Sequence, residues 1–236
     1  KNYYLSNIFK KNLKDKDKTL KILQPKQKLF YGRLLAGIIN KKTKAFSANH
    51  SYYDSTSTKE YFNNRVSKRS YPYFKNSLNR ITMYPIMSPS VLHVHIEVTH
   101  GDKNFKSEIQ KIESPGGNPI TFDVGELINK YNLKDISLFK VVATSKNNKI
   151  PTRVNHQLIY GEKDSISKLL CSINTSLINK EVFIPKNKKG LTWGQIIIND
   201  DYVSKLGISF SSNKGSKENV LIDFYGKNGK INTFND

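Results

Sequence analysis

The sequence predicts an all-β protein with two antiparallel, sandwich-like domains and short helical turns. Two observations lead to this prediction. Short apolar or alternating segments recur along the chain and are separated by turn residues, which is the pattern of sandwich strands. Long segments with an apolar period of 3.6 residues, which a helical fold would need, are scarce.

The pattern divides the chain into five parts. They are a basic, partly ordered N-terminal segment (residues 1–28), a β-rich segment that we interpret as the possible end of a truncated repeat (29–61), a basic and aromatic linker (62–80), a β-sandwich domain (81–161) and a second β-rich domain (162–236). The runs that end at His50 and His156 resemble each other and lie about one sandwich domain apart, which is compatible with a tandem repeat. Because the chain starts at Lys1 and stops soon after a predicted hairpin, we expect it to be a piece of a longer protein.

The first predicted strands form a hairpin. Residues 34–39 are apolar, residues 40–43 form a polar turn, and residues 44–49 return. Residues 62–80 then combine basic and aromatic side chains without any period, so we interpret them as the connection between domains.

The clearest strand covers residues 91–99. Apolar residues at every second position from Leu92 to Val98 alternate with mostly polar ones, so one face of this strand should be buried and the other solvated. After a loop at residues 114–119, which is rich in Pro and Gly, we expect a short strand at 120–124 and helical turns at 125–131.

Further strands are predicted toward the C-terminus. Their ranges are 136–144, 153–160, 169–173, 181–184, 192–198 and 220–225. The last of them is followed by Asn228-Gly229, a pair that favours a type I′ hairpin turn.

The net charge of +20 is the largest deviation of the composition. It predicts attraction to polyanions such as nucleic acid or acidic polysaccharide. However, only five of the 39 basic residues are arginine, and the lysines accompany abundant Asn and Ile, which is typical of an AT-rich coding sequence. Coding bias is therefore the competing explanation of the charge.

Several classes of protein lack support in the sequence. The lone cysteine, Cys171, excludes an internal disulfide, and no run of 18 apolar residues predicts a membrane-spanning helix. The chain contains neither a Gly-x-Ser-x-Gly elbow nor a phosphate-binding glycine loop. We therefore expect no cofactor and find no motif of an enzyme.

The first candidate site would bind a glycan or another anion. Planar amides, charged groups and aromatic platforms are the usual components of sugar sites. The residues are Arg153, Asn155, His156, Tyr160 and Trp193. The competing interpretation is structural, because polar side chains often close turns and large aromatic residues fill sandwich cores.

The second candidate would bind nucleic acid through base stacking and phosphate contacts. It comprises the basic and aromatic residues Arg65, Lys68, Arg69, Tyr71, Tyr73, Lys75 and Arg80. The third candidate is a metal site at His93, His95 and Glu97, because side chains two residues apart on a strand point the same way. Its structural alternative is the polar face of an amphipathic strand.

Together these patterns favour a non-catalytic binding or adhesion-type protein with a glycan or polyanion as its ligand. A basic nucleic-acid-associated protein and a metal-dependent enzyme are the alternatives. Compartment and oligomeric state do not follow from the sequence.

Overall fold

The fold is mostly β, with antiparallel sheets and one short helix among the described residues. The computed structural model describes residues 35–42, 44, 46–50, 61–62, 66–83, 91–113, 119–151, 154–162, 171–177, 194–197, 199–200, 204–208 and 219–235. Residues 1–180 and 181–236 form two compact units, which are described separately below. The predicted β class is thus confirmed.

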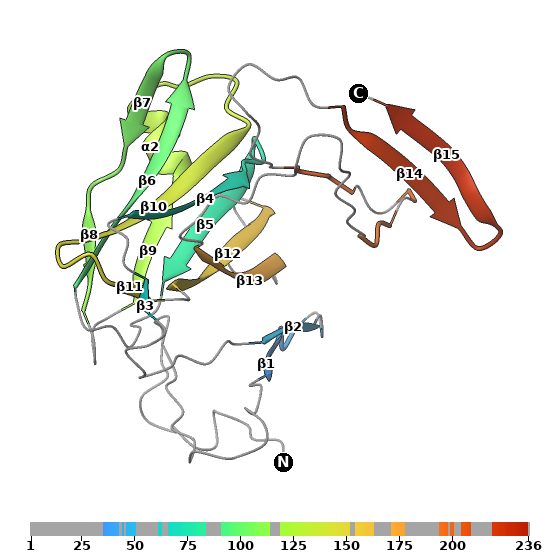
Figure 1. The fold of residues 1–236 in the computed structure, drawn as a ribbon. Coiled ribbons are helices and arrows are strands. Elements are labelled where there is room, and N and C mark those ends of the chain that lie inside the picture. Colours follow the sequence, from blue (N-terminus) through green and yellow to red (C-terminus); the bar gives the residue numbers. More distant parts are fainter. Residues whose placement is uncertain are drawn as a thin grey trace. The chain divides into compact units, whose positions relative to one another are not determined.

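The first sheet of residues 1–180 has five strands (Figure 1). They are β4 (Val66–Pro72), β10 (Leu138–Ser145), β6 (Leu92–His100), β7 (Lys103–Lys106) and β8 (Gln110–Ile112). β10 lies between β4 and β6, while β7 and β8 pair one after the other with the far side of β6. Between them, the Ser107 hydroxyl accepts a hydrogen bond from the Ile96 amide at 2.9 Å and so continues the pairing.

The second sheet has the order β13-β12-β5-β9. Its strands are β5 (Ser77–Met83), β9 (Ile120–Asp123), β12 (Val154–Glu162) and β13 (Cys171–Leu177). β13, which we expected to begin the second domain, therefore pairs with a strand of the predicted first domain.

Both sheets contribute to one hydrophobic core. Leu92, Val94, Ile96 and Val98 point inward from β6, as their alternation predicted, and all four are fully buried. Their partners in the core include Ile81, Met83, Val154 and Leu158 from the other sheet. The two sheets are therefore packed face to face.

Helix α2 (Val124–Lys130) follows β9 directly and adds Val124, Leu127 and Ile128 to this core. Asp123 caps it, because its side chain accepts a hydrogen bond from the Gly125 amide at 2.9 Å. The predictions of a strand at 120–124 and helical turns at 125–131 coincide with β9 and α2.

The predicted linker at residues 62–80 is where the structure differs most from the sequence pattern. Most of it forms β4 and β5, which belong to opposite sheets and are joined by a tight turn. The turn is held by Asn79, whose side chain bonds the backbone of Phe74 and Ser77. β4 and β5 lack an apolar alternation because Ser67 and Asn79, both polar, are buried.

Two short pairings complete the described part of the first unit. β1 (Leu35–Ile39) and β2 (Phe46–His50) form the predicted N-terminal hairpin. β3 (Tyr61–Phe62) pairs with β11 (Ile150–Pro151).

In the second unit, β14 (Leu221–Gly226) and β15 (Gly229–Asn235) form the predicted C-terminal hairpin. Its turn is not type I′, because positive φ occurs at Gly229 (107°) and not at Asn228. Residues 194–197 lie outside any strand, and the strand predicted at 181–184 lies outside the described residues.

Candidate functional site

The residues of the predicted glycan site on β12 point to opposite sides of its sheet. His156 is 1% exposed and lies in the interior, whereas Asn155 is on the outer face and half-buried. Arg153 and Trp193 lie outside the described residues. The described part of this candidate is therefore not one continuous surface.

His156 joins the two sheets through a buried hydrogen bond. Its Nδ1 donates to the Val154 carbonyl (3.1 Å), so its Nε2 accepts from the Tyr71 hydroxyl (2.7 Å). Burial, the main cause, and the nearby positive charge of Arg69 lower the pKa of His156 from 6.5 to about 4, although the bond to Val154 acts in the opposite direction. A neutral imidazole is thus built into the core.

Tyr160 also serves the core. Its hydroxyl donates to the Pro72 carbonyl at 2.9 Å, and its ring meets that of Phe74 edge-on, with centroids 5.1 Å apart. Tyr71, Tyr160 and His156 were predicted as ligand contacts, but their polar atoms bind other parts of the protein. Sequence reasoning missed this role because His and Tyr occur both in cores and at sites.

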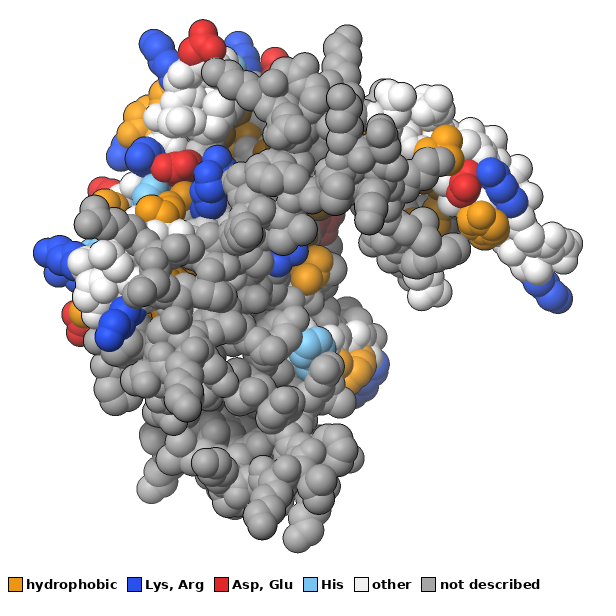
Figure 2. Space-filling model, in the orientation of Figure 1, with side chains coloured by type: hydrophobic (Ala, Val, Ile, Leu, Met, Phe, Trp, Pro, Cys, Tyr) orange, Lys and Arg blue, Asp and Glu red, His pale blue; other side chains and the backbone are white. Residues whose placement is uncertain are grey.

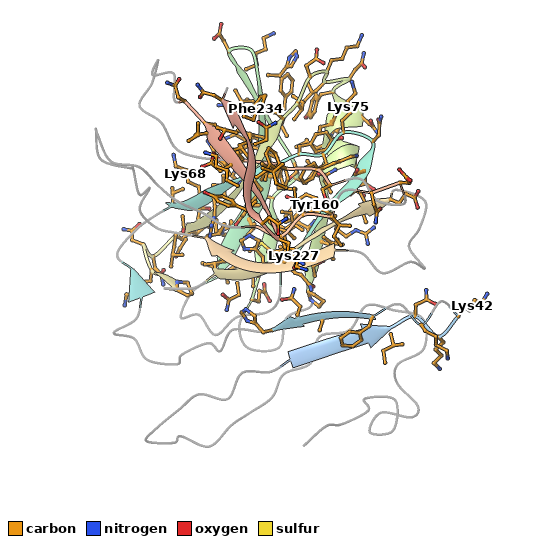
Figure 3. All side chains as sticks on the ribbon, turned by 90° about the vertical axis from the view of Figure 1, so that its right-hand side faces the viewer. Lys42, Lys68, Lys75, Tyr160, Lys227 and Phe234 are labelled. Carbon is orange, nitrogen blue, oxygen red and sulfur yellow. The ribbon has the colours of Figure 1, made fainter. Side chains whose placement is uncertain are left out.

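The predicted nucleic-acid stretch is divided among several environments. Lys68 is on the outer face of the first sheet, Tyr71 is 5% exposed in the core, and Lys75 is exposed in the β4–β5 turn. Figure 3 shows Lys68 and Lys75 on opposite sides of the described side chains.

The other members of this stretch are equally separated. Arg69 lies over the Tyr71 ring (5.7 Å), and Arg80 is in the second sheet, opposite Asp123. Tyr73 is half-buried, and burial together with Asp123 raises the pKa of its hydroxyl. Arg65 lies outside the described residues.

The three residues of the predicted metal site share the outer face of β6, as their spacing indicated. His95 Nε2 and Glu97 Oε1 are 3.0 Å apart, whereas His93 lies opposite Lys111 of β8. In the part of the chain that the structure describes, no group of three His, Cys, Asp or Glu side chains could hold a metal ion.

These three residues belong to a larger surface that we call the lysine face, the outer face of the first sheet. Strand register places one residue of each adjacent strand directly opposite its neighbour, about 4.8 Å away. The rows are Lys68–Val142–His95, Lys140–Glu97–Lys106 and Thr144–His93–Lys111. Four lysines from four strands thus share this face with one carboxylate, and two of them, Lys140 and Lys106, lie directly opposite it.

The charge is distributed unequally between the two sheets. The strands of the first sheet contain six basic residues and one acidic residue, Glu97. Those of the second sheet contain one basic residue, Arg80, and two acidic ones, Asp123 and Glu162. Arg69 and Lys103 lie opposite Val141 and His100, at positions of the other face, so four of the six basic residues belong to the lysine face.

Glu97 is the electrostatic centre of the lysine face. Its Oε1 lies 3.0 Å from His95 Nε2 and 3.1 Å from Lys106 Nζ. Partial burial favours a raised pKa of Glu97, but the hydrogen bonds from His95 and Lys106 lower it below its ordinary value. Figure 2 shows basic side chains beside a carboxylate and a histidine over the region of β6 and β10.

Sequence reasoning missed the lysine face as a unit, although it singled out Lys68, His93, His95 and Glu97. The available signal was lysine alternating with apolar residues, as in Phe139-Lys140-Val141.

Comparison with protein-family models, curated proteins and solved structures finds no match for this chain. No helix within the described residues has the length and apolar character needed to cross a membrane.

Proposed function

We propose that this chain is a non-catalytic binding or adhesion-type protein that binds a polyanionic glycan through the lysine face. The observation that carries the proposal is that four lysines from four strands share a single sheet face with only one strand carboxylate among the described residues. Lysine ammonium groups on adjacent strands match a ligand that carries repeated sulfate or carboxylate groups. The second sandwich-like domain that the sequence predicts is part of the same proposal, but its start moves from residue 162 to residue 181, because β13 pairs with β12 of the first unit.

The positive charge of the lysine face is available to a ligand. Lys106 is 57% exposed at its side chain, and Lys111 is exposed on the short strand β8. Within the described residues, Lys111 and Lys140 have no ion-pair partner. At least two of the four ammonium groups of the lysine face are therefore not neutralised within the described residues.

The chemistry of the face favours a glycan over nucleic acid. Single-stranded nucleic acids are bound by aromatic stacking in addition to charge. The described strands place no Phe, Tyr or Trp on the lysine face, since Tyr71, Phe105 and Phe139 all belong to the inner side. Sulfated or carboxylated sugars need no stacking platform to engage lysines.

The test compares a sulfated polysaccharide, single-stranded DNA and a neutral polysaccharide. A variant in which Lys68, Lys106, Lys111 and Lys140 are all replaced by Gln should bind the sulfated chain at least about tenfold more weakly at physiological salt. The control variant replaces Lys130, Lys134, Lys146 and Lys149, which are exposed outside this face and carry the same total charge.

The control variant should lose less than about threefold in affinity, because the same net charge is removed away from the contact. Equal losses in the two variants would refute a localised site. If the protein bound single-stranded DNA more tightly than a sulfated polysaccharide with the same number of negative charges, the nucleic-acid alternative would instead be favoured. The slope of log affinity against log salt concentration should decrease in magnitude by about one for each contacting lysine that is removed.

A further inference from the structure

Glu97 occupies the position on the lysine face where an acidic group of a ligand would be attracted. Lys140 lies directly opposite it on β10, and Lys106 lies directly opposite it on β7. Glu97 binds only the second of these lysines in the described structure, with Oε1 3.1 Å from Lys106 Nζ. A bound anion between the same strands would compete for that ammonium group.

The two partners of Glu97 differ in their freedom to move. The side chain of His95 is 10% exposed, and that of Glu97 itself is 17% exposed, so both are held in the sheet face. The Lys106 side chain is 57% exposed and can turn toward solvent. Loss of Lys106 would still leave Glu97 with His95 as a hydrogen-bond partner, which limits the cost of the exchange.

We propose that Glu97 is an internal competitor for the glycan, and that an acidic group of the ligand replaces it as the partner of Lys106. This inference rests on the proposed function and adds a residue that limits affinity. Glu97 keeps the lysine face partly neutralised until a ligand with several acidic groups arrives. Single small anions then bind less readily than extended polyanions, because only the latter contact the surrounding lysines at the same time.

The experiment measures binding of the sulfated polysaccharide to Glu97→Gln and to a matched control, Glu126→Gln. Glutamine preserves the shape of the side chain and its hydrogen-bonding oxygen while removing the charge. We expect Glu97→Gln to bind about fivefold more tightly, because the charged competitor for Lys106 is removed. Glu126 is exposed on α2, outside the lysine face, and its variant should change affinity less than about twofold.

A second pair of variants separates competition for Lys106 from simple repulsion. If Glu97 acts by holding Lys106, the gain from Glu97→Gln should largely disappear when Lys106 is already replaced by Met. An equal gain in both backgrounds would overturn the inference, as would no gain in a Glu97→Gln protein with an unchanged circular dichroism spectrum.

The binding experiments distinguish a failure of the proposed function from a failure of this inference. If the wild type binds the polysaccharide and the fourfold lysine variant does not, the proposed function stands whatever Glu97→Gln does. If the wild type does not bind it at all, both are overturned.

Discussion

The buried pair Tyr71–His156 predicts that stability decreases in mild acid. Folding keeps the imidazole neutral, whereas the unfolded chain exposes it to protonation below its ordinary pKa of 6.5. Because the pKa in the folded protein is about 4, protons bind the unfolded state preferentially between these two values. The contribution of His156 is therefore fully favourable above pH 6.5 and decreases as the pH falls toward 4.

The expected loss follows from the two pKa values. Each pKa unit corresponds to about 1.4 kcal/mol, so the free energy of unfolding should fall by about 2 kcal/mol between about pH 7 and about pH 5. This interval lies above the ordinary pKa values of the carboxyl groups, so acidic residues contribute little to the change.

The assay is urea unfolding followed by far-ultraviolet circular dichroism at several pH values in that interval. Tyr71→Phe should destabilise the protein by about 1–3 kcal/mol at neutral pH, because it leaves the buried Nε2 of His156 without its donor. Combining Tyr71→Phe with His156→Leu removes both polar partners. This double variant should be more stable than Tyr71→Phe alone and should lose the pH dependence.

His100→Gln provides the control, because His100 is exposed at the end of β6 and should leave the pH dependence unchanged. The reasoning would be refuted if the double variant kept the pH dependence of the wild type. It would also be refuted if the wild type were equally stable at both ends of the interval.

Substitutions at three further positions test local features of the fold by the same urea unfolding. Asn79→Ala removes three hydrogen bonds from a 1% exposed β5 side chain to the backbone of Phe74 and Ser77, and it should cost about 2 kcal/mol. A neutral result would contradict the role of Asn79 in holding the β4–β5 turn. Asp123→Ala removes the cap of α2 and should cost about 1 kcal/mol, while Asp123→Asn should retain most of the stability. Gly101→Ala should cost about 1 kcal/mol because Gly101 has φ of 59° in the β6–β7 turn, and an equally stable variant would argue against that backbone conformation.

The sequence predicted the strands that alternate regularly and missed those whose inward positions are polar. The predictions at 91–99, 136–144 and 153–160 coincide with β6, β10 and β12, apart from one or two residues at the ends. β4 presents Ser67 and Tyr71 to the interior, and β5 buries Asn79, whose side chain bonds the backbone of the preceding turn. Such strands lack the apolar period on which sequence reasoning depends.

The candidate site was predictable only in part, because it is assembled by strand pairing. His95 and Glu97 share one strand, so their spacing was enough to place them on one face. Lys140 and Lys106 join them only through the register of β10 and β7, which the sequence does not determine. For His156 the signal was present, because Val154 and Leu158, which share its side of β12, are apolar, whereas Asn155 and Gln157 belong to the opposite face.

The crossing of the chain between the sheets at residues 73–76 has a consequence for folding. β4 and β5 are neighbours in sequence, yet Arg69 pairs with Val141 and Ile81 pairs with Leu158. During synthesis on the ribosome, both strands must wait for much later segments before their main partners exist. Pairing over such distances along the chain makes folding slow and leaves unpaired strand edges exposed for longer, when they are open to aggregation or to a chaperone.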